Sequence, residues 1–191
     1  MTLVDSKATP IERITPTGIR TSDAAYEFDI IVYATGFDAL RGAFDRIDFR
    51  GAGGVALKEK WRDGATSLVG MLQDGFPNMF MLLGPHTALG NIPRSIEFNV
   101  DWVTALLRHM RDHGLTRAEA EPAAVATWME HVHEVARGLL SMEVDSWMTG
   151  VNSNVAGRQS RSIARYTGSA PTYRAWANGI ADRGYAGVAL A

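Results

Sequence analysis

The chain has 191 residues, with 19 basic and 21 acidic side chains and a formal net charge of −2. This near-neutral balance gives no electrostatic footprint for nucleic acid or for an anionic membrane surface, so we expect neither as a partner. With 46% hydrophobic residues, the sequence predicts a globular chain with one sizeable core rather than a disordered one.

The chain contains no cysteine, which excludes disulfides, thiolate nucleophiles and cysteine-based metal sites. Its first residues do not show a basic start followed by an apolar core, and no apolar run approaches the roughly 20 residues that span a bilayer. These features lead us to expect a cytoplasmic protein without a membrane partner.

The first third of the sequence predicts β-structure. Residues 11–14 and 19–21 are strand-like runs on either side of a Pro-Thr-Gly turn, which is typical of a hairpin. A third run, residues 26–33, would complete a small meander, and we expect its apolar part, residues 30–33, to be a buried strand.

Two apolar runs end abruptly on small or turn-forming residues. Residues 30–33 are followed by Ala34, Thr35 and Gly36, and a second predicted buried strand, residues 79–83, ends on Gly-Pro. The ends of strands are where α/β folds bind nucleotide cofactors, although any buried strand can end on a glycine turn. No G-x-G-x-x-G follows either run, so this polypeptide by itself is not expected to hold a dinucleotide.

The middle third predicts a long helix from residue 94 or 95 to residue 113. Pro93 stands near its first turn and Gly114 follows as a C-terminal cap. Apolar residues recur at three- and four-residue steps, at Ile96, Val100, Val103, Leu107 and Met110.

A second helix is predicted to open at Pro122. Thr116 and Glu119 have the spacing of a capping box just ahead of it. Its apolar stripe consists of Val125, Trp128, Val132, Val135 and Leu139.

Beyond Ser141 the composition changes to glycine, asparagine and serine around the large aromatic Trp147, which predicts a long loop. A last helix is predicted over residues 171–182, closed by Gly184, and the apolar residues 185–190 after it fit a strand.

Five segments, in order and over nearly the whole chain, carry a family resemblance: YEFDIIVYATGFDAL, VALKEKW, GFPNMFMLLGP, IEFNVDWV and SWMTGVN. The chain resembles the C-terminal part of flavin-dependent Baeyer–Villiger monooxygenases of the phenylacetone and cyclohexanone monooxygenase kind. The resemblance implies an α/β fold, the C-terminal portion of a flavoprotein with two dinucleotide-binding domains, in which a small β-meander and the closing strands of the FAD domain precede helices. It implies a meander and interdomain linker strands over residues 1–36, a strand and helical region over 37–140, and a mobile loop with a terminal helix over 141–191.

The resemblance also implies a reaction. In the family, NADPH reduces FAD, the reduced flavin reacts with O2, and one oxygen atom is inserted into a ketone to give an ester or lactone. Both glycine-rich motifs of the family, and its fingerprint F-x-G-x-x-x-H-x-x-x-W, lie upstream of the matched region. FAD and NADPH would therefore be bound mainly by a missing N-terminal part, and this chain alone is expected to be inactive. Two alternatives stay open: a related flavin N- or S-monooxygenase, and a non-catalytic truncated module.

The family's site residues map onto seven positions, none of them catalytic. Cofactor contacts fall on Gly36, Asn91, Ile92 and Trp147, and the loop that lines the substrate pocket falls on Ala88, Leu89 and Gly90. The loop is two residues shorter than in phenylacetone monooxygenase, so the range of ketones does not carry over. Trp147 could instead simply pack a surface loop.

Other residues support plainer interpretations. The four histidines His109, His113, His131 and His133 lack a carboxylate that would complete a ligand set, so we expect no metal. The remaining tryptophans are expected to pack in the core, and the charges of ALKEKWRDG to lie on a solvated surface. Strands that end without their usual partners would leave apolar surface exposed, through which we expect self-association.

Overall fold

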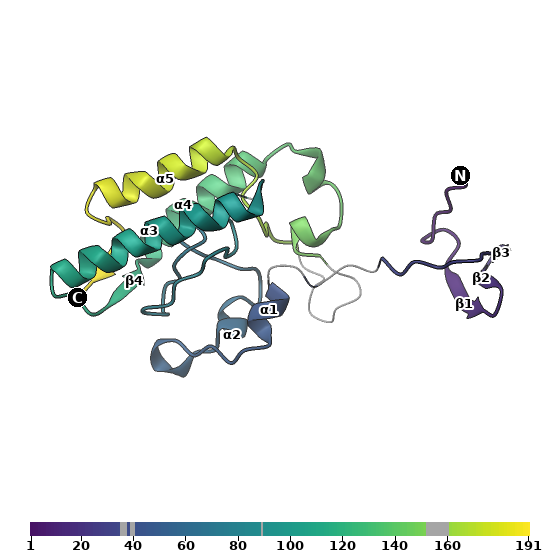
Figure 1. The fold of residues 1–191 in the computed structure, drawn as a ribbon, viewed down its shortest axis with the longest axis horizontal. Coiled ribbons are helices and arrows are strands. Elements are labelled where there is room, and N and C mark those ends of the chain that lie inside the picture. The colour runs from purple at the N-terminus through teal and green to yellow at the C-terminus, as the bar shows by residue number, and fades with distance from the viewer. Residues whose placement is uncertain (35–37, 39–40, 89, 152–160) are drawn as a thin grey trace. The chain divides into compact units, whose positions relative to one another are not determined.

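The computed structural model describes residues 1–34, 38, 41–88, 90–151 and 161–191 (Figure 1). The chain divides into two compact units, Met1–Phe37 and Asp38–Ala191. Within the described residues, no helix is both long and apolar enough to cross a membrane.

The N-terminal unit is a three-stranded antiparallel meander of β1 (Ile11–Thr15), β2 (Gly18–Thr21) and β3 (Ala25–Glu27). The predicted hairpin is therefore confirmed. Gly18 is required where β2 meets β3, because a Cβ at this position would lie 1.9 Å from the carbonyl oxygen of Tyr26.

The buried strand predicted over residues 30–33 is wrong. β3 already ends at Glu27, and Ile30 and Val32 expose 79% and 81% of their surface. A strand needs a neighbour to accept its backbone hydrogen bonds, and no described strand pairs with this segment.

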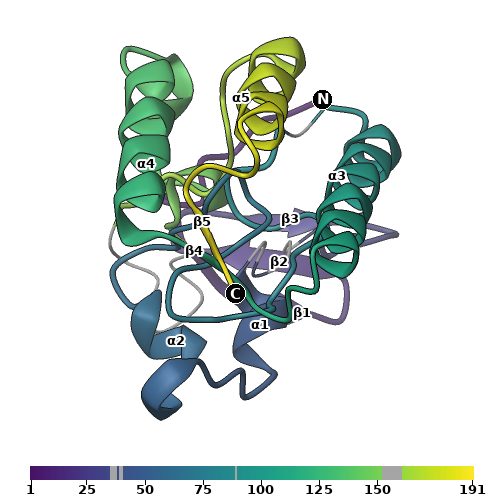
Figure 2. The ribbon, with the colours of Figure 1, turned by 90° about the vertical axis from the view of Figure 1, so that its left-hand side faces the viewer.

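The C-terminal unit contains α1 (Arg41–Asp45), α2 (Leu57–Lys60), α3 (Ile92–Asp112), α4 (Pro122–Ala136), α5 (Ala170–Asp182), the 3-10 turns η1 (Ala52–Gly54), η2 (Leu140–Met142) and η3 (Trp147–Thr149), and the strands β4 (Ala118–Ala120) and β5 (Val188–Leu190). Helix α5 lies against both α3 and α4 (Figures 1 and 2). The Trp102 indole of α3 donates to the carbonyl of Ala177 in α5 at 2.8 Å, and Trp128 of α4 meets Trp176 of α5 with ring centroids 5.5 Å apart.

The long helix predicted in the middle of the chain is confirmed as α3, and Gly114 follows it with a φ of 67°. Its inward face differs from the predicted stripe, because Val100 and Leu107 are exposed while Asn99 and Trp102 are buried. Both buried side chains donate hydrogen bonds to α5, from the Asn99 amide nitrogen to the Tyr173 hydroxyl and from the Trp102 indole to the Ala177 carbonyl. The Asn99 amide oxygen is buried without a hydrogen-bond partner among the described residues.

The capping box predicted at Thr116 and Glu119 is wrong, although α4 does begin at Pro122. Residues Ala118–Ala120 form β4, which pairs antiparallel with β5, and the N-cap of α4 is Glu121. The predicted final helix and C-terminal strand are confirmed as α5 and β5.

The second predicted buried strand, residues 79–83, is also wrong. Asn78 and Leu83 have φ values of 58° and 150°, which interrupt an extended backbone on both sides, and Leu82 is 45% exposed. Of this segment only Met81 is buried, in a small cluster around Trp61 that is separate from the larger core of α3, α4 and α5.

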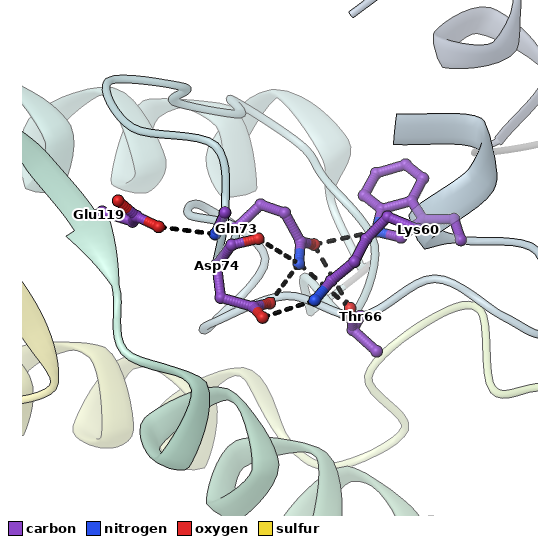
Figure 3. A network of polar contacts seen from close by, with 7 residues as sticks. Lys60, Thr66, Gln73, Asp74 and Glu119 are labelled. Atoms are coloured by element: carbon purple, nitrogen blue, oxygen red, sulfur yellow. Dashed lines mark hydrogen bonds and ion pairs between the residues drawn. The ribbon is translucent and has the colours of Figure 1, made fainter. Parts of the chain in front are cut away.

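A polar network joins α2 to the following loop and to β4 (Figure 3). The ammonium of Lys60 lies 2.5 Å from a carboxylate oxygen of Asp74, whose other oxygen accepts from the Gln73 amide at 2.5 Å. The Gln73 amide oxygen accepts from the Trp61 indole at 2.9 Å, and Glu119 accepts from the Gly75 N–H at 2.8 Å. The charged residues of ALKEKWRDG are exposed, as predicted, and Lys60 reaches from this surface to the buried carboxylate of Asp74.

Candidate functional site

The loop that leads into α3 holds most of the described residues for which a site role is predicted. Ala88 is buried, and its carbonyl accepts from the Ser95 hydroxyl at 2.8 Å. The Asn91 side chain is the N-cap and accepts from the Arg94 N–H at 3.1 Å. Ile92 is the first helical residue and is 46% exposed. Local capping chemistry therefore fixes this loop against the helix.

The N-terminus of α3 keeps a backbone donor that can reach a ligand. Pro93 has no N–H, and the N–H groups of Arg94 and Ser95 donate to Asn91. Among the described residues the Ile92 N–H has no hydrogen-bond acceptor, so it is a donor at the positive end of a 21-residue helix, and a Cβ on Gly90 would meet no atom within 4 Å. This geometry suits an electronegative group of a bound molecule.

His86, which the sequence did not single out, is the most buried titratable residue of this region. Its Nε2 lies 2.8 Å from the carbonyl oxygen of Ile163, and its Nδ1 lies 3.0 Å from the Ser67 hydroxyl. Burial lowers the pKa of His86 to about 4, the Ile163 carbonyl partly opposes this, and the nearby charge of His133 lowers the pKa further. The imidazole is neutral at pH 7. A histidine in a turn gives no periodic signal, so only the fold reveals its surroundings.

Residues 162–166, here called the connecting segment, join this loop to η3. The N–H of Tyr166 donates to the Thr87 carbonyl, and Ala88 forms a parallel bridge with Tyr166. On the other side, the N–H groups of Ser162 and Ala164 donate to Thr149 and Met148 at 2.8 and 3.1 Å.

Trp147 opens η3 and is 41% exposed. The turn is held by the buried Thr149, whose hydroxyl donates to the carbonyls of Val144 and Ser146 and accepts from the Ser146 N–H. Trp147 therefore stands on an ordered turn with part of its indole accessible. Neither role proposed for Trp147, a cofactor contact or the packing of a surface loop, is tested by this geometry.

The structure brings Ala88, Asn91 and Ile92 together with Gly90 on one loop, and it links Trp147 to that loop through the connecting segment. The predicted sites at Gly36 and Leu89 lie outside the described residues.

The described part of the chain holds no group of three or more His, Asp, Glu or Cys side chains that could bind a metal ion. The rings of His109 and His113 are tilted by 34° with their centroids 4.2 Å apart, and Nε2 of His131 lies 2.9 Å from the Tyr166 hydroxyl. The predicted packing role of the other tryptophans is confirmed, since Trp61, Trp102 and Trp128 are buried and Trp176 is partly buried against the core.

Comparison with curated proteins gives relatives over essentially the whole chain. A 2-oxo-Δ3-4,5,5-trimethylcyclopentenylacetyl-CoA monooxygenase of Pseudomonas putida is 37% identical over 191 residues, which cover 99% of this chain and 35% of the relative. A cyclopentanone 1,2-monooxygenase of a Comamonas species is 38% identical and covers 100% and 34%. A phenazine N-monooxygenase of Lysobacter antibioticus is 36% identical and covers 100% and 35%. No family model matches the chain.

Solved structures agree with these relatives. A closed structure of cyclohexanone monooxygenase superposes with a TM-score of 0.87 at 36% identity, over 98% of this chain and 35% of that one. A structure of OTEMO in complex with FAD and NADP gives a TM-score of 0.84 at 36% identity, over 98% of this chain and 34% of that one. The fold thus matches the C-terminal third of flavin-dependent monooxygenases.

More specifically, the chain corresponds to the C-terminal part of the Baeyer–Villiger monooxygenases, as the resemblance in sequence predicted. It spans about a third of the length of the curated relatives that it matches.

Proposed function

We propose that this chain forms the C-terminal part of an NADPH- and FAD-dependent Baeyer–Villiger monooxygenase that inserts one atom of O2 into a ketone to give an ester or lactone. The observation that carries the proposal is the similarity to ketone monooxygenases along the whole chain, at 38% identity to the cyclopentanone enzyme. The dinucleotide-binding motifs would come from an upstream part of the enzyme, since no G-x-G-x-x-G occurs in these 191 residues.

The residues of the α3 loop fit a role at the flavin. The Ile92 N–H and the helix dipole would stabilise negative charge at the pyrimidine edge of the ring, while Asn91 keeps the first turn in place. When bound, FAD would supply the activation of O2, with NADPH as the source of electrons. Ala88 and Gly90 would line the ketone side of the loop.

Trp147 is suited to cover the bound nicotinamide nucleotide. Its indole is large, partly accessible and carries an N–H donor, so it can shield a ribose from water and hydrogen-bond to it. In this proposal, the whole chain is the C-terminal part of the FAD-binding domain. Residues 1–36 would be the meander and interdomain linker strands, 37–140 the strand and helical region, and 141–191 the mobile loop and terminal helix. We place the complete enzyme in the cytoplasm.

A second function, oxygenation of a nitrogen, is supported by one specific observation. The phenazine N-monooxygenase of Lysobacter antibioticus is 36% identical over the whole chain, so relatives at the same level of similarity carry names for different acceptors. The acceptor is therefore the property that an experiment has to decide.

A chimera tests both functions. The corresponding C-terminal third of the Comamonas cyclopentanone monooxygenase is replaced by this chain, and the purified chimera is assayed for NADPH oxidation coupled to product from cyclopentanone, a phenyl sulfide and phenazine. We expect an FAD-containing enzyme that forms the lactone. The intact Comamonas enzyme, and a chimera with Asn91→Ala and Trp147→Ala, serve as controls.

The outcomes separate the hypotheses. Product from phenazine but not from ketone would transfer the assignment to N-oxygenation. A folded chimera that retains FAD, but oxidises NADPH without forming any oxygenated product, would contradict a role of this chain in enclosing the site.

The isolated chain is proposed to associate with itself through apolar side chains that the complete enzyme would cover. Ile30, Val32 and Tyr33 expose 79%, 81% and 70% of their surface in succession along one segment. Light scattering is expected to show oligomers that dissociate in the triple variant with serine at these positions. The purified chain is expected to be colourless, and a yellow protein that retains FAD would contradict the proposed division of the cofactor sites.

A further inference from the structure

We propose that His86 is a positioning residue that holds the connecting segment, residues 162–166, between the α3 loop and the turn of Trp147. One buried imidazole would then fix the position of the loop of Ala88, Asn91 and Ile92 relative to the turn of Trp147. The inference rests on the proposed function for its meaning, but the contacts on which it depends belong to this chain alone.

The tautomer of His86 follows from its partners. The atom 2.8 Å from Nε2 is the carbonyl oxygen of Ile163, which can only accept, so Nε2 carries the proton. In the neutral ring Nδ1 is then an acceptor, and the single proton of the Ser67 hydroxyl is shared between Nδ1 at 3.0 Å and the Pro85 carbonyl oxygen at 2.9 Å. Ser67 is itself fixed, since it accepts from the Gly70 N–H at 3.1 Å. The bond of Nε2 therefore forms only when the connecting segment is in place, and the contact of Nδ1 depends on the loop of Ser67.

The connecting segment bonds to different elements on its two sides. Towards the α3 loop, the His86 N–H donates to the Ala164 carbonyl at 3.3 Å and the Tyr166 N–H donates to the Thr87 carbonyl at 3.4 Å. Towards η3, the Ser162 N–H donates to Thr149 at 2.8 Å. A displacement of this segment would therefore move the Trp147 turn relative to Ala88 and Asn91.

The side-chain hydrogen bond of His86 is stronger than the two backbone hydrogen bonds that join the connecting segment to the loop before α3. The two backbone bonds there are 3.3 and 3.4 Å long, at the weak end of the range, whereas the imidazole bond to Ile163 is 2.8 Å long and fully buried. If this bond were lost, a buried carbonyl would remain without its donor. The backbone of His86 also adopts a left-handed φ of 66°, a conformation that is uncommon for residues other than glycine.

A matched pair of variants separates positioning from packing. In His86→Gln the side-chain amide nitrogen can take the place of Nε2 and still donate to Ile163. In His86→Asn the amide is too short to reach Ile163, although asparagine tolerates the left-handed backbone better. If His86 acted only through packing and backbone strain, His86→Asn would keep the connecting segment ordered as well as His86→Gln or better. If the hydrogen bond to Ile163 matters, only His86→Gln would keep the segment ordered.

Amide hydrogen exchange of the full chain, without flavin or ketone, measures the effect. We expect exchange about tenfold faster in His86→Asn for peptides that cover the connecting segment and η3, with α3 and α5 unchanged, and near wild-type exchange in His86→Gln. Equal exchange in the two variants, or faster exchange throughout α3 and α5, would overturn the proposal.

A second measurement needs no variant. Nitrogen-15 spectra of the histidine rings at pH 7 are expected to show His86 as the Nε2–H tautomer with a slowly exchanging proton, and an Nδ1–H tautomer would overturn the proposal. Neither readout depends on oxygenation, so an inactive chimera with intact exchange protection would count against the proposed function and leave the role of His86 standing.

Discussion

At the scale of single residues, His86 makes the stability of the chain depend on pH. Its pKa is about 4 in the folded chain, because burial disfavours the charged ring, against an ordinary value of 6.5. The unfolded chain therefore binds a proton first as pH falls. The contribution of a neutral His86 is fully present above pH 6.5 and is lost as pH falls through 4. Burial lowers the pKa of His131 as well, which acts in the same direction.

Urea unfolding at several pH values checks this expectation. Between pH 7 and pH 4.5 we expect His86 to account for a fall of about 2–3 kcal/mol in the free energy of unfolding. Titrating carboxylates also contribute in this range, so the informative quantity is the difference from His86→Gln, which has no titrating ring. If the wild type and the variant lost stability in parallel, His86 would not be the buried neutral group described above.

Gly150 is the residue that allows the connecting segment to approach η3. It has a left-handed φ of 74°, and a Cβ there would lie 2.3 Å from the Ser162 hydroxyl oxygen. Gly138 has a similar φ of 76° with nothing within 4 Å of its Cβ position, which makes it a matched control.

Both alanine variants should lose about 1–2 kcal/mol of unfolding free energy to backbone strain. Gly150→Ala should lose more, and it alone should increase the quenching of Trp147 fluorescence by acrylamide, measured as the difference from a Trp147→Phe background. Equal effects of the two substitutions would mean that the contact with Ser162 is easily relieved.

At the scale of elements, the Gln73 amide couples the end of α2 to the loop that follows it. Its oxygen accepts from the Trp61 indole, and its nitrogen donates to Asp74 and, at 3.2 Å, to Thr66. Gln73→Leu keeps the volume but leaves a buried indole N–H and one carboxylate oxygen without these partners. We expect a loss of about 2–3 kcal/mol in the free energy of unfolding by urea.

A surface ion pair provides the comparison for this variant. Arg111 and Asp112 are adjacent on the exposed end of α3, with a distance of 2.8 Å between nitrogen and oxygen. Arg111→Ala should cost less than about 1 kcal/mol. If the two substitutions cost the same, the network around Gln73 would be no more stabilising than an exposed pair.

The elements that the sequence predicted are those with a signal contained in one stretch of chain. The periodicity and the flanking Pro93 and Gly114 were enough for α3, and the turn before Gly18 was enough for the hairpin. Residues 79–83 have a strand-like composition, but their backbone conformation is decided by left-handed residues on both sides and by the contact of Met81 with Met71. Contacts between residues far apart in the chain leave no periodic pattern in the sequence from which the backbone conformation could be predicted.

At the scale of the whole molecule, the same distinction governs the candidate site. The resemblance in sequence pointed to Ala88, Asn91, Ile92 and Trp147, but nothing in the order of residues indicated that residues 162–166 bond to both regions. His86 escaped attention because its partners, Ser67 and Ile163, are 19 and 77 positions away.

The division into two units predicts where a protease will cut. Phe28 and Tyr33 are 50% and 70% exposed in a segment outside any strand, whereas the core of the second unit is closed by the contacts of α3, α4 and α5. Brief treatment with chymotrypsin should therefore cleave at these aromatic residues first and leave a fragment that contains α3 to α5, identifiable by mass spectrometry. A Phe28→Ser, Tyr33→Ser variant should survive longer under the same conditions. Should the wild type resist cleavage at the dilution where light scattering finds monomers, the segment must be covered within the chain itself, and the exposed apolar surface invoked for self-association would not exist.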